Sequence, residues 1–306
     1  MRPIIDQPRP VPFTGVDGEE GLAAIAAQLA EGRTAVLTGA GISTESGIPD
    51  YRGETGRLRR AHPMTFQEFI ADEANRRRYW ARGFVGRGAI QRARPNAGHR
   101  AVQALHASGH IGGVVTQNVD GLHRAAGTAD AVELHGALDR VRCLDCGTIS
   151  PRDALDERLG AVNGDFLAAV AAHRAAARDA GQVNPDGDVE LPDALVDGFR
   201  MVPCERCGGV LKPDVVFFGE NVPRERVRRS EELIDEAASV LVLGSSLAVF
   251  SGLRLVRRAA KDGKPVSAIT QGPTRGDLHL HARAHRPLGP TLTALSRTLG
   301  VPVPAP

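Results

Sequence analysis

The four cysteines of this sequence stand in two pairs that share one spacing. Cys143 and Cys146 form the first pair, Cys204 and Cys207 form the second, and a glycine follows each pair. Two Cys-x-x-Cys pairs can place four thiolates at the corners of a tetrahedron, which is the geometry of closed structural zinc sites. The alternative, four unrelated buried cysteines, leaves the repeated spacing without a cause. We therefore predict a structural zinc centre whose ligation stabilises the folded state.

A second group of polar residues follows a short apolar run near the N-terminus. Residues 35–37 read Ala-Val-Leu, which is a buried-strand pattern, and residues 39–41 read Gly-Ala-Gly. Glycines let a backbone approach a phosphate closely. The dinucleotide fingerprint has Gly or Ala where Thr44 stands, so this segment alone also fits an ordinary turn. The hydroxyl of Ser43 and the Asp-Tyr-Arg of residues 50–52 favour a nucleotide site.

Strand and helix patterns alternate along most of the chain. Apolar runs predict strands at residues 35–37, 113–116, 131–134, 215–218, 240–243 and 265–269. Helical spacing predicts helices at residues 19–31, 96–106, 224–237, 253–260 and 290–299, with helical insertions at 65–92 and 166–180. This alternation predicts an α/β protein with a Rossmann-like parallel sheet and helices on both faces. Ligands of such sheets bind beyond the carboxyl ends of the strands, which selects the loops 39–52, 117–121, 135–136 and 244–247.

Length and composition bound the organisation of the chain. Its 306 residues allow one large domain and a smaller module. The predicted parts are a Rossmann-like domain of residues 1–52, 93–138 and 212–306, a helical insertion of residues 53–92, and a zinc-binding module of residues 139–211. A net charge of +2 predicts no strong field for nucleic acid. The sequence has neither the apolar core of a signal peptide nor an apolar run of about 20 residues, so we expect a cytoplasmic protein with no membrane partner. We take a monomer as the default oligomeric state.

Further motifs occur in a fixed order between these segments. They are Thr-Gln-Asn-Val-Asp-Gly-Leu-His from residue 116, Glu-Leu-His-Gly from residue 133, Lys-Pro-Asp-Val-Val-Phe-Phe-Gly-Glu from residue 212, and Gly-Ser-Ser-Leu from residue 244. Together with Gly-Ala-Gly-Ile-Ser, Gly-Ile-Pro-Asp-Tyr-Arg and the two cysteine pairs, this order resembles that of the sirtuin family of NAD-dependent protein deacylases. The resemblance covers residues 19–299. Residues 78–82, 139–141 and 272–275 are similar to the class II branch of that family.

The resemblance implies a role for each matching residue. NAD would be bound by Gly39, Ala40, Gly41, Ser43, Asp50, Tyr51, Arg52, Gln117, Asn118, Asp120, Gly244, Ser245 and Ser246. His135 would be the general base, with Asn118 and Asp120 completing the catalytic group. The plainer alternative for His135 is a polar residue that closes a strand. The backbone of the substrate would pair in extended form with Val215, Val216 and Phe217.

The resemblance also implies a reaction. The protein would transfer the acyl group of an acylated protein lysine to ADP-ribose and release nicotinamide, with NAD and zinc as cofactors. An imidazole of near-neutral pKa suits deprotonation of a ribose hydroxyl. Three alternatives stay open, which are protein mono-ADP-ribosyl transfer, a non-enzymatic zinc-ribbon module that binds nucleic acid, and an ordinary NAD dehydrogenase. The near-neutral charge disfavours the second, and the interrupted glycine fingerprint disfavours the third.

Two departures from the family pattern concern affinity and substrate choice. Thr270 and Gln271 stand where relatives place an asparagine that contacts the adenosine end of NAD, which puts NAD affinity in question. The Tyr-x-x-Arg pair that selects negatively charged acyl groups is not recognisable near residues 56–60. We therefore expect uncharged acyl groups rather than succinyl or malonyl groups.

Overall fold

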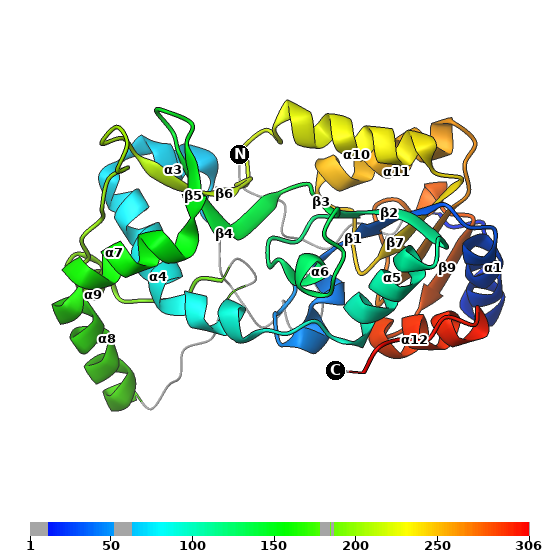
Figure 1. The fold of residues 1–306 in the computed structure, drawn as a ribbon, viewed down its shortest axis with the longest axis horizontal. Coiled ribbons are helices and arrows are strands. Elements are labelled where there is room, and N and C mark those ends of the chain that lie inside the picture. The colour runs from blue at the N-terminus through cyan, green and yellow to red at the C-terminus, as the bar shows by residue number, and fades with distance from the viewer. Residues whose placement is uncertain (1–11, 52–62, 178–183, 185–186, 306) are drawn as a thin grey trace. The chain divides into compact units, whose positions relative to one another are not determined.

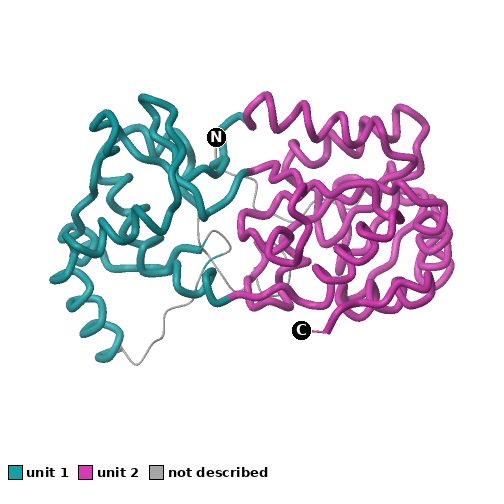
Figure 2. The backbone as a smooth tube through the Cα atoms, in the orientation of Figure 1, with its two compact units in different colours: residues 1, 61–92, 136–221 teal, residues 2–60, 93–135, 222–306 magenta. Residues whose placement is uncertain are grey.

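The chain divides into two compact units (Figure 2). The structure is a computed structural model that describes residues 12–51, 63–177, 184 and 187–305. Unit 1 comprises residues 1, 61–92 and 136–221, and unit 2 comprises residues 2–60, 93–135 and 222–306. Each unit is therefore assembled from segments that are distant in the sequence.

Unit 2 contains a six-stranded parallel sheet with the strand order β3-β2-β1-β7-β8-β9 (Figure 1). Its strands are β1 (Thr34–Thr38), β2 (Ile111–Thr116), β3 (Val132–Glu133), β7 (Ser239–Leu243), β8 (Val266–Thr270) and β9 (Ala282–His285). Every residue of β1, β7 and β8 is buried, as expected when helices cover both faces of a sheet. The sequence does not predict β9, because its Ala-Arg-Ala-His segment lacks a continuous apolar run.

Alternate strand residues of unit 2 pack into two separate cores. Val36 and Leu241 belong to one core, which includes residues of helices α1 (Gly18–Ala30), α5 (Ala97–Ala107) and α12 (Leu288–Thr298). Ala35 and Val242 belong to the other, which includes residues of α10 (Arg224–Glu236) and α11 (Phe250–Lys261). Successive side chains of a strand point to opposite faces, so each strand supplies both cores. The prediction of a Rossmann-like parallel sheet with helices on both faces is confirmed.

The strand order reverses between β1 and β7. Strands β2 and β3 lie on one side of β1, whereas β7, β8 and β9 continue on the other side. In open α/β sheets, ligands bind at such a switch point, beyond the carboxyl ends of the strands. The loops that follow β1 and β7 are two of the four loops predicted to form the site.

Unit 1 contains a three-stranded antiparallel sheet with the order β5-β4-β6. Its strands are β4 (Gly136–Cys143), β5 (Ile149–Pro151) and β6 (Leu211–Val215), and its helices are α3 (Phe66–Ala71), α4 (Glu73–Arg92), α7 (Arg152–Val162), α8 (Gly164–Ala177) and α9 (Asp193–Val196). Trp80, the single tryptophan of the chain, is 3% exposed and donates its Nε1–H to the carbonyl of Leu211 at 3.2 Å. Trp80 is therefore a probe of the folding of unit 1.

The observed units differ from the predicted domains near residue 212. The sequence predicts a strand at residues 215–218, but β6 lies at Leu211–Val215 and pairs with β4, which places residues 212–221 in unit 1. The charged residues Lys212 and Asp214 hide this strand in the sequence. Both are buried with ion-pair partners, since Lys212 Nζ lies 3.1 Å from a carboxylate oxygen of Glu220 and Asp214 lies 3.3 Å from Nε of Arg140. The division into the three predicted parts stays a prediction.

Membrane insertion has no candidate helix in the part of the chain that the structure describes, because no helix there is both long and apolar enough to span a bilayer. The cytoplasmic location and the monomeric state stay predictions.

Two histidine side chains are buried together in unit 2. The ring centroids of His99 in α5 and His123 in α6 (Leu122–Ala125) lie 4.9 Å apart, and the residues are 0% and 3% exposed. His123 Nε2 lies 3.0 Å from the hydroxyl of Thr38, whereas both nitrogens of His99 lack a partner among the described residues. Burial lowers the pKa of His123 to about 4 and lowers the pKa of His99 well below its ordinary value. Both rings are therefore neutral at pH 7.

We expect unit 2 to lose stability as the pH falls from about 6.5 towards 4. In this range the unfolded chain binds protons at His99, His123 and His135, whereas burial lowers the pKa of each of these side chains in the folded chain, so each ring that stays neutral costs up to about 1.4 kcal/mol per pH unit. His99→Phe should reduce this slope, because it removes one of these buried histidines. Urea unfolding at several pH values, followed by circular dichroism for the whole chain and by Trp80 fluorescence for unit 1, measures the slope.

The matched control for this variant is Val102→Ala, since Val102 is buried in the same helix and has no titratable group. That change should leave the pH slope of unit 2 as it is in the unchanged protein. If the stability of the His99→Phe protein had the same pH slope as that of the unchanged protein, this would contradict the buried neutral state of His99.

Candidate active site and metal centre

The loop after β1 contacts the loop after β7 through backbone atoms. The N–H groups of Gly39 and Gly41 donate to the carbonyls of Leu243 and Gly244, both at 2.9 Å. A Cβ atom on Gly39 would lie 2.7 Å from the Cβ of Ser245, and a Cβ on Gly41 would lie 2.9 Å from the Cα of Gly244. The sequence predicts these glycines as room for a phosphate. In the structure, the contact between the two loops itself requires glycine at both positions.

A hydrogen-bond network joins the loop after β1 to the loop after β2. The Ser43 hydroxyl donates to Asp120 Oδ2 at 2.7 Å, and Asn118 Nδ2 donates to Ser43 Oγ at 3.0 Å and to the carbonyl of Gly39 at 3.1 Å. The backbone N–H of Leu122 donates to Asp120 Oδ1 at 2.9 Å. Burial raises the pKa of the Asp120 carboxyl, and these hydrogen bonds act against that rise. Three predicted site residues therefore fix one another's side chains.

Gln117 connects three of the predicted loops. Its Nε2 donates to Ser245 Oγ at 2.8 Å and to the carbonyl of Thr38 at 3.2 Å. Its backbone carbonyl lies 2.8 Å from Nδ1 of His135. A Cβ atom on Gly252 would lie 2.5 Å from Gln117 Oε1, so the start of α11 also packs closely against this amide. The amide is thus held between the two central strands of the sheet.

His135 has a hydrogen-bond neighbour at each ring nitrogen. Nδ1 faces the carbonyl of Gln117, and Nε2 lies 2.7 Å from the hydroxyl oxygen of Ser251. A carbonyl can only accept, so Nδ1 carries the hydrogen and Nε2 carries the lone pair of the neutral ring. Burial lowers the pKa of His135 to about 4, below the near-neutral value predicted from the sequence. At pH 7 the ring is a neutral proton acceptor at Nε2, as a general base must be.

The structure brings most of the predicted site residues into one network within unit 2. Its members are Gly39, Gly41, Ser43, Gln117, Asn118, Asp120, His135, Gly244 and Ser245. Ala40 lies between the two glycines and is the first residue of the short helix η1 (Ala40–Ile42). The carbonyl of Ser246 accepts a hydrogen bond from the backbone N–H of Arg275 at 2.9 Å. Asp50 and Tyr51 are half-buried farther along the loop after β1, and Arg52 lies outside the described residues.

The three predicted substrate residues do not belong to this network. Val215 ends β6 in unit 1, and Val216 and Phe217 follow it. The Phe217 ring stacks on Phe69 with centroids 5.1 Å apart, and its backbone N–H donates to Glu220 at 2.8 Å. Pairing of this segment with a peptide stays a prediction.

Two contacts of the site were not predicted from the sequence. Ser251 contacts the predicted general base, and Glu45 accepts the backbone N–H of Gly289 at 2.8 Å, which ties the loop after β1 to α12. Neither residue belongs to a motif that requires its side chain. The only signals in the sequence are positional, since Ser251 stands shortly after the predicted site loop 244–247 and Glu45 stands within the predicted site loop 39–52.

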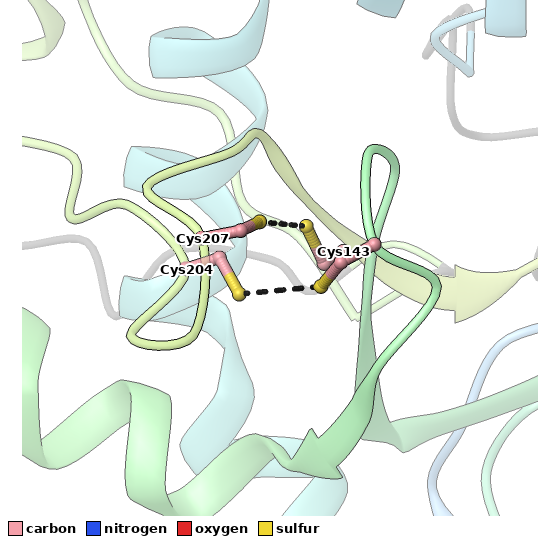
Figure 3. A group of neighbouring side chains, drawn as sticks. Cys143, Cys204 and Cys207 are labelled. Carbon is pink, nitrogen blue, oxygen red and sulfur yellow. Dashed lines mark hydrogen bonds between the residues drawn. The ribbon is translucent and has the colours of Figure 1, made fainter.

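The four cysteines meet in unit 1 (Figure 3). Their sulfur atoms all lie within 4.8 Å of one another, with 3.5 Å between Cys143 and Cys207 and 3.9 Å between Cys146 and Cys204. Sulfur ligands about 2.3 Å from one tetrahedral zinc ion would be about 3.8 Å apart. The four free thiols therefore fit one zinc ion, and four protein ligands leave no position for a substrate.

Each cysteine pair forms a tight turn that ends in glycine. The N–H of Gly147 donates to the carbonyl of Cys143 at 3.1 Å, and the N–H of Gly208 donates to the carbonyl of Cys204 at 2.8 Å. Gly147 and Gly208 have φ angles of +71° and +74°, a backbone conformation that favours glycine. The turn geometry thus explains the glycine that follows both pairs in the sequence.

The fold and this site define a nucleotide-binding α/β protein with a separate structural metal centre. A family model described as the Sir2 family matches residues 39–251, which is more than half of the chain. The chain therefore belongs to the Sir2 family.

Proteins named as deacetylases or as Sir2 match 80% or more of this chain. The NAD-dependent protein deacetylase 1 of Streptomyces coelicolor is 55% identical over 286 residues, which cover 94% of this chain and 92% of that protein. The NAD-dependent protein deacetylase 2 of Bradyrhizobium diazoefficiens is 47% identical over 80% of this chain and 86% of its own. A solved Sir2 homologue in complex with NAD is 25% identical with a TM-score of 0.71, and the match covers 94% of this chain and 97% of that chain.

A second solved structure contains Sir2 with a p53 peptide and NAD. It is 26% identical to this chain with a TM-score of 0.69, and the match covers 91% of this chain and 98% of that chain. The predictions of the sirtuin family, of NAD as cofactor and of NAD-dependent protein deacylation are thereby confirmed at the level of the family. The assignment to the class II branch stays a prediction.

Removal of one zinc ligand should unfold the cysteine module of unit 1. Cys204→Ser is expected to abolish zinc binding and to lower the urea concentration at which Trp80 fluorescence changes, because ligation stabilises only the folded arrangement. Zinc content per chain and Trp80 unfolding measure both effects. Glu205→Ala is the matched control, since Glu205 lies in the same turn, is exposed and has no sulfur atom that could bind zinc. A full zinc content in the Cys204→Ser protein would contradict the four-ligand site.

Substitution at Gly39 should separate the two central loops. Gly39→Ala places a Cβ atom 2.7 Å from the Cβ of Ser245, and such overpacking typically costs about 1–3 kcal/mol. We expect lower stability of unit 2 and weaker NAD binding, measured by urea unfolding and titration calorimetry. Gly83→Ala in α4 is the control, because a Cβ there meets nothing within 4 Å. Equal NAD affinity of the Gly39→Ala and unchanged proteins would show that the loops need not touch.

Proposed function

We propose that this protein removes acyl groups from protein lysines by transferring them to ADP-ribose with release of nicotinamide. One observation carries the proposal, which is the neutral His135 ring whose Nδ1–H is fixed by the Gln117 carbonyl and whose Nε2 is left as proton acceptor. The same glutamine donates to Ser245 beside the glycine loop. The base is therefore coupled to the loops that would hold NAD. The deacetylase names of the relatives and the p53 peptide in a related structure support this assignment.

The residues present fit NAD, because a glycine-lined switch point and convergent amide and hydroxyl groups suit a dinucleotide. Bound NAD would supply a glycosidic bond whose nicotinamide is a good leaving group. Gly39, Gly41 and Gly244 would give the phosphates access to backbone atoms. Asn118 and Asp120, which Ser43 holds in place, would orient the ribose. His135 would accept a ribose hydroxyl proton at Nε2, since its Nδ1 is already protonated.

The adenosine end of the site contains the departure noted in the sequence. The Thr270 hydroxyl donates to the carbonyl of Gly272 at 2.7 Å, whereas the Gln271 side chain is exposed beyond the carboxyl end of β8. Gln271 is therefore the residue of this pair that has its polar group available. We assign to Gln271 the contact that an asparagine makes in relatives.

The proposed function includes a choice of acyl group on the lysine. Residues 56–60, where the sequence lacks the Tyr-x-x-Arg pair, lie outside the described residues. We infer an uncharged acyl group from the sequence alone. The test uses one lysine peptide that carries acetyl, butyryl, lipoyl or succinyl groups in turn, incubated with NAD and followed by mass spectrometry. Acyl-ADP-ribose that forms together with free lysine establishes the reaction and names the acyl class.

The same experiment tests the alternative acceptor. In protein mono-ADP-ribosyl transfer, nicotinamide would be released while the acyl peptide stays unchanged, and label from adenine-labelled NAD would remain on protein. That result would overturn the proposed deacylation.

Replacement of the general base should remove acyl transfer without unfolding the protein. His135→Ala is expected to lower the rate of acyl-ADP-ribose formation at least about 100-fold, the lower range for general acid–base catalysis. NAD binding by calorimetry and zinc content should stay close to those of the unchanged protein. His106→Ala is the matched control, because His106 pairs with Asp130 outside this network. Normal turnover by the His135→Ala protein would exclude His135 as the base.

A further inference from the structure

Ser251 contacts the nitrogen of His135 that has to accept a proton. Its hydroxyl oxygen lies 2.7 Å from His135 Nε2, and the opposite nitrogen lies 2.8 Å from the carbonyl of Gln117. The two contacts come from different elements, since Gln117 follows β2 and Ser251 is the second residue of α11. The imidazole is therefore held at both ends by groups that are far apart in the sequence.

The direction of the serine bond follows from the opposite end of the ring. The carbonyl of Gln117 requires a hydrogen on Nδ1, so Nε2 of the neutral ring has a lone pair and no hydrogen. The Ser251 hydroxyl must then donate to Nε2. A hydroxyl is also an acceptor, so after Nε2 takes up a proton the same oxygen can accept from it by rotation of its O–H. The Nε2 lone pair accepts one hydrogen at a time, so the serine hydrogen turns away from Nε2 when a proton arrives there. The serine oxygen then stays beside the nitrogen as the acceptor, so the contact exists in both protonation states of the base.

The core of unit 2 fixes the place of this hydroxyl. Leu253 and Val256 of α11 are fully buried in the core of unit 2 that also contains Ala35. Gly252, between Ser251 and Leu253, packs against the Gln117 side chain. A side chain on a packed helix is positioned more closely than one on a free loop. Ser251 therefore meets His135 from a rigid element.

We propose that Ser251 is a positioning residue for the general base. Its hydroxyl holds the His135 ring against the Gln117 carbonyl, with the Nε2 lone pair in one direction, until the ribose hydroxyl takes the place of the serine hydrogen at Nε2 and delivers its proton there. The inference rests on the proposed function, in which His135 acts after nicotinamide has left. It predicts that Ser251 affects acyl transfer and leaves the earlier release of nicotinamide unchanged.

The first test needs no NAD. In the protein with ¹⁵N-labelled histidine, the hydrogen bond from Ser251 shifts the Nε2 resonance of His135 upfield of a free imine nitrogen. Ser251→Ala should move this resonance downfield, and Ser251→Thr, which keeps a hydroxyl, should leave it near its original place. The His135→Ala protein identifies the resonance. An unchanged resonance in the Ser251→Ala protein would mean that no such bond exists and would overturn the proposal.

The second test separates the two steps of the reaction. Ser251→Ala should slow acyl-ADP-ribose formation about fivefold to tenfold, the factor that corresponds to one net hydrogen bond. The KM for NAD and the exchange of labelled nicotinamide into NAD should stay as they are. Ser251→Thr should restore the rate of acyl transfer.

Three results of the second test would overturn the proposal. Acyl transfer that is unchanged or faster in the Ser251→Ala protein would mean that the hydroxyl does not position the base. An equal loss in nicotinamide exchange and acyl transfer would indicate a general effect on folding or NAD binding. A Ser251→Thr protein that keeps the resonance position but not the rate would show that the bond is irrelevant to catalysis.

Failure of the proposed function gives a different pattern. In that case the unchanged protein would form no acyl-ADP-ribose from any of the acyl peptides, while the resonance of His135 would still respond to Ser251→Ala.

Discussion

The candidate site depends on the close approach of two backbone segments at the switch point of the sheet. Strands β1 and β7 pair in parallel with Thr38 opposite Leu243, so their loops begin at the same level. A Cβ atom on Gly39, Gly41 or Gly244 would lie less than 3 Å from atoms of the opposing loop. Glycine at these positions lets the loops share this space. Their contact places the Ser245 hydroxyl beside the Gln117 amide, and the backbone of Gln117 in turn orients the His135 ring.

Burial acts on the ionisable groups of this network in one direction, since it favours the neutral form of each. It raises the pKa of Asp120 and lowers the pKa of His135 to about 4. The neutral state of the His135 ring at pH 7 suits the proposed reaction for two reasons. A neutral ring can accept a proton, and it adds no positive charge near a ribose that becomes positive as nicotinamide leaves. The sequence motif identifies the histidine, but its protonation state depends on packing that the motif does not contain.

The sequence predicted the site better than it predicted the connections within it. Gly39, Asn118, Asp120 and His135 are recognisable because their motifs follow apolar strands, and the parallel sheet places the ends of those strands at one edge. Ser251 was not predicted, because its contact depends on how α11 packs against Gln117. Strand β6 was misplaced because two buried charges, whose partners lie elsewhere in unit 1, interrupt its apolar pattern. Long-range contacts therefore account for what the motifs alone could not provide.

The metal centre shows why a long insertion between two ligand pairs is tolerated. Residues 147–203 separate the pairs and contain α7, α8 and α9. The entropy cost of closing a loop rises by only about 0.6 kcal/mol for each doubling of its length. Zinc ligation in small finger peptides contributes roughly 10–16 kcal/mol. The pairing of β4 with β6 also brings the two ends of this insertion together, because Cys143 lies opposite Leu211. The spacing within each pair is therefore the strict constraint on zinc binding, whereas the distance between the pairs is free to vary.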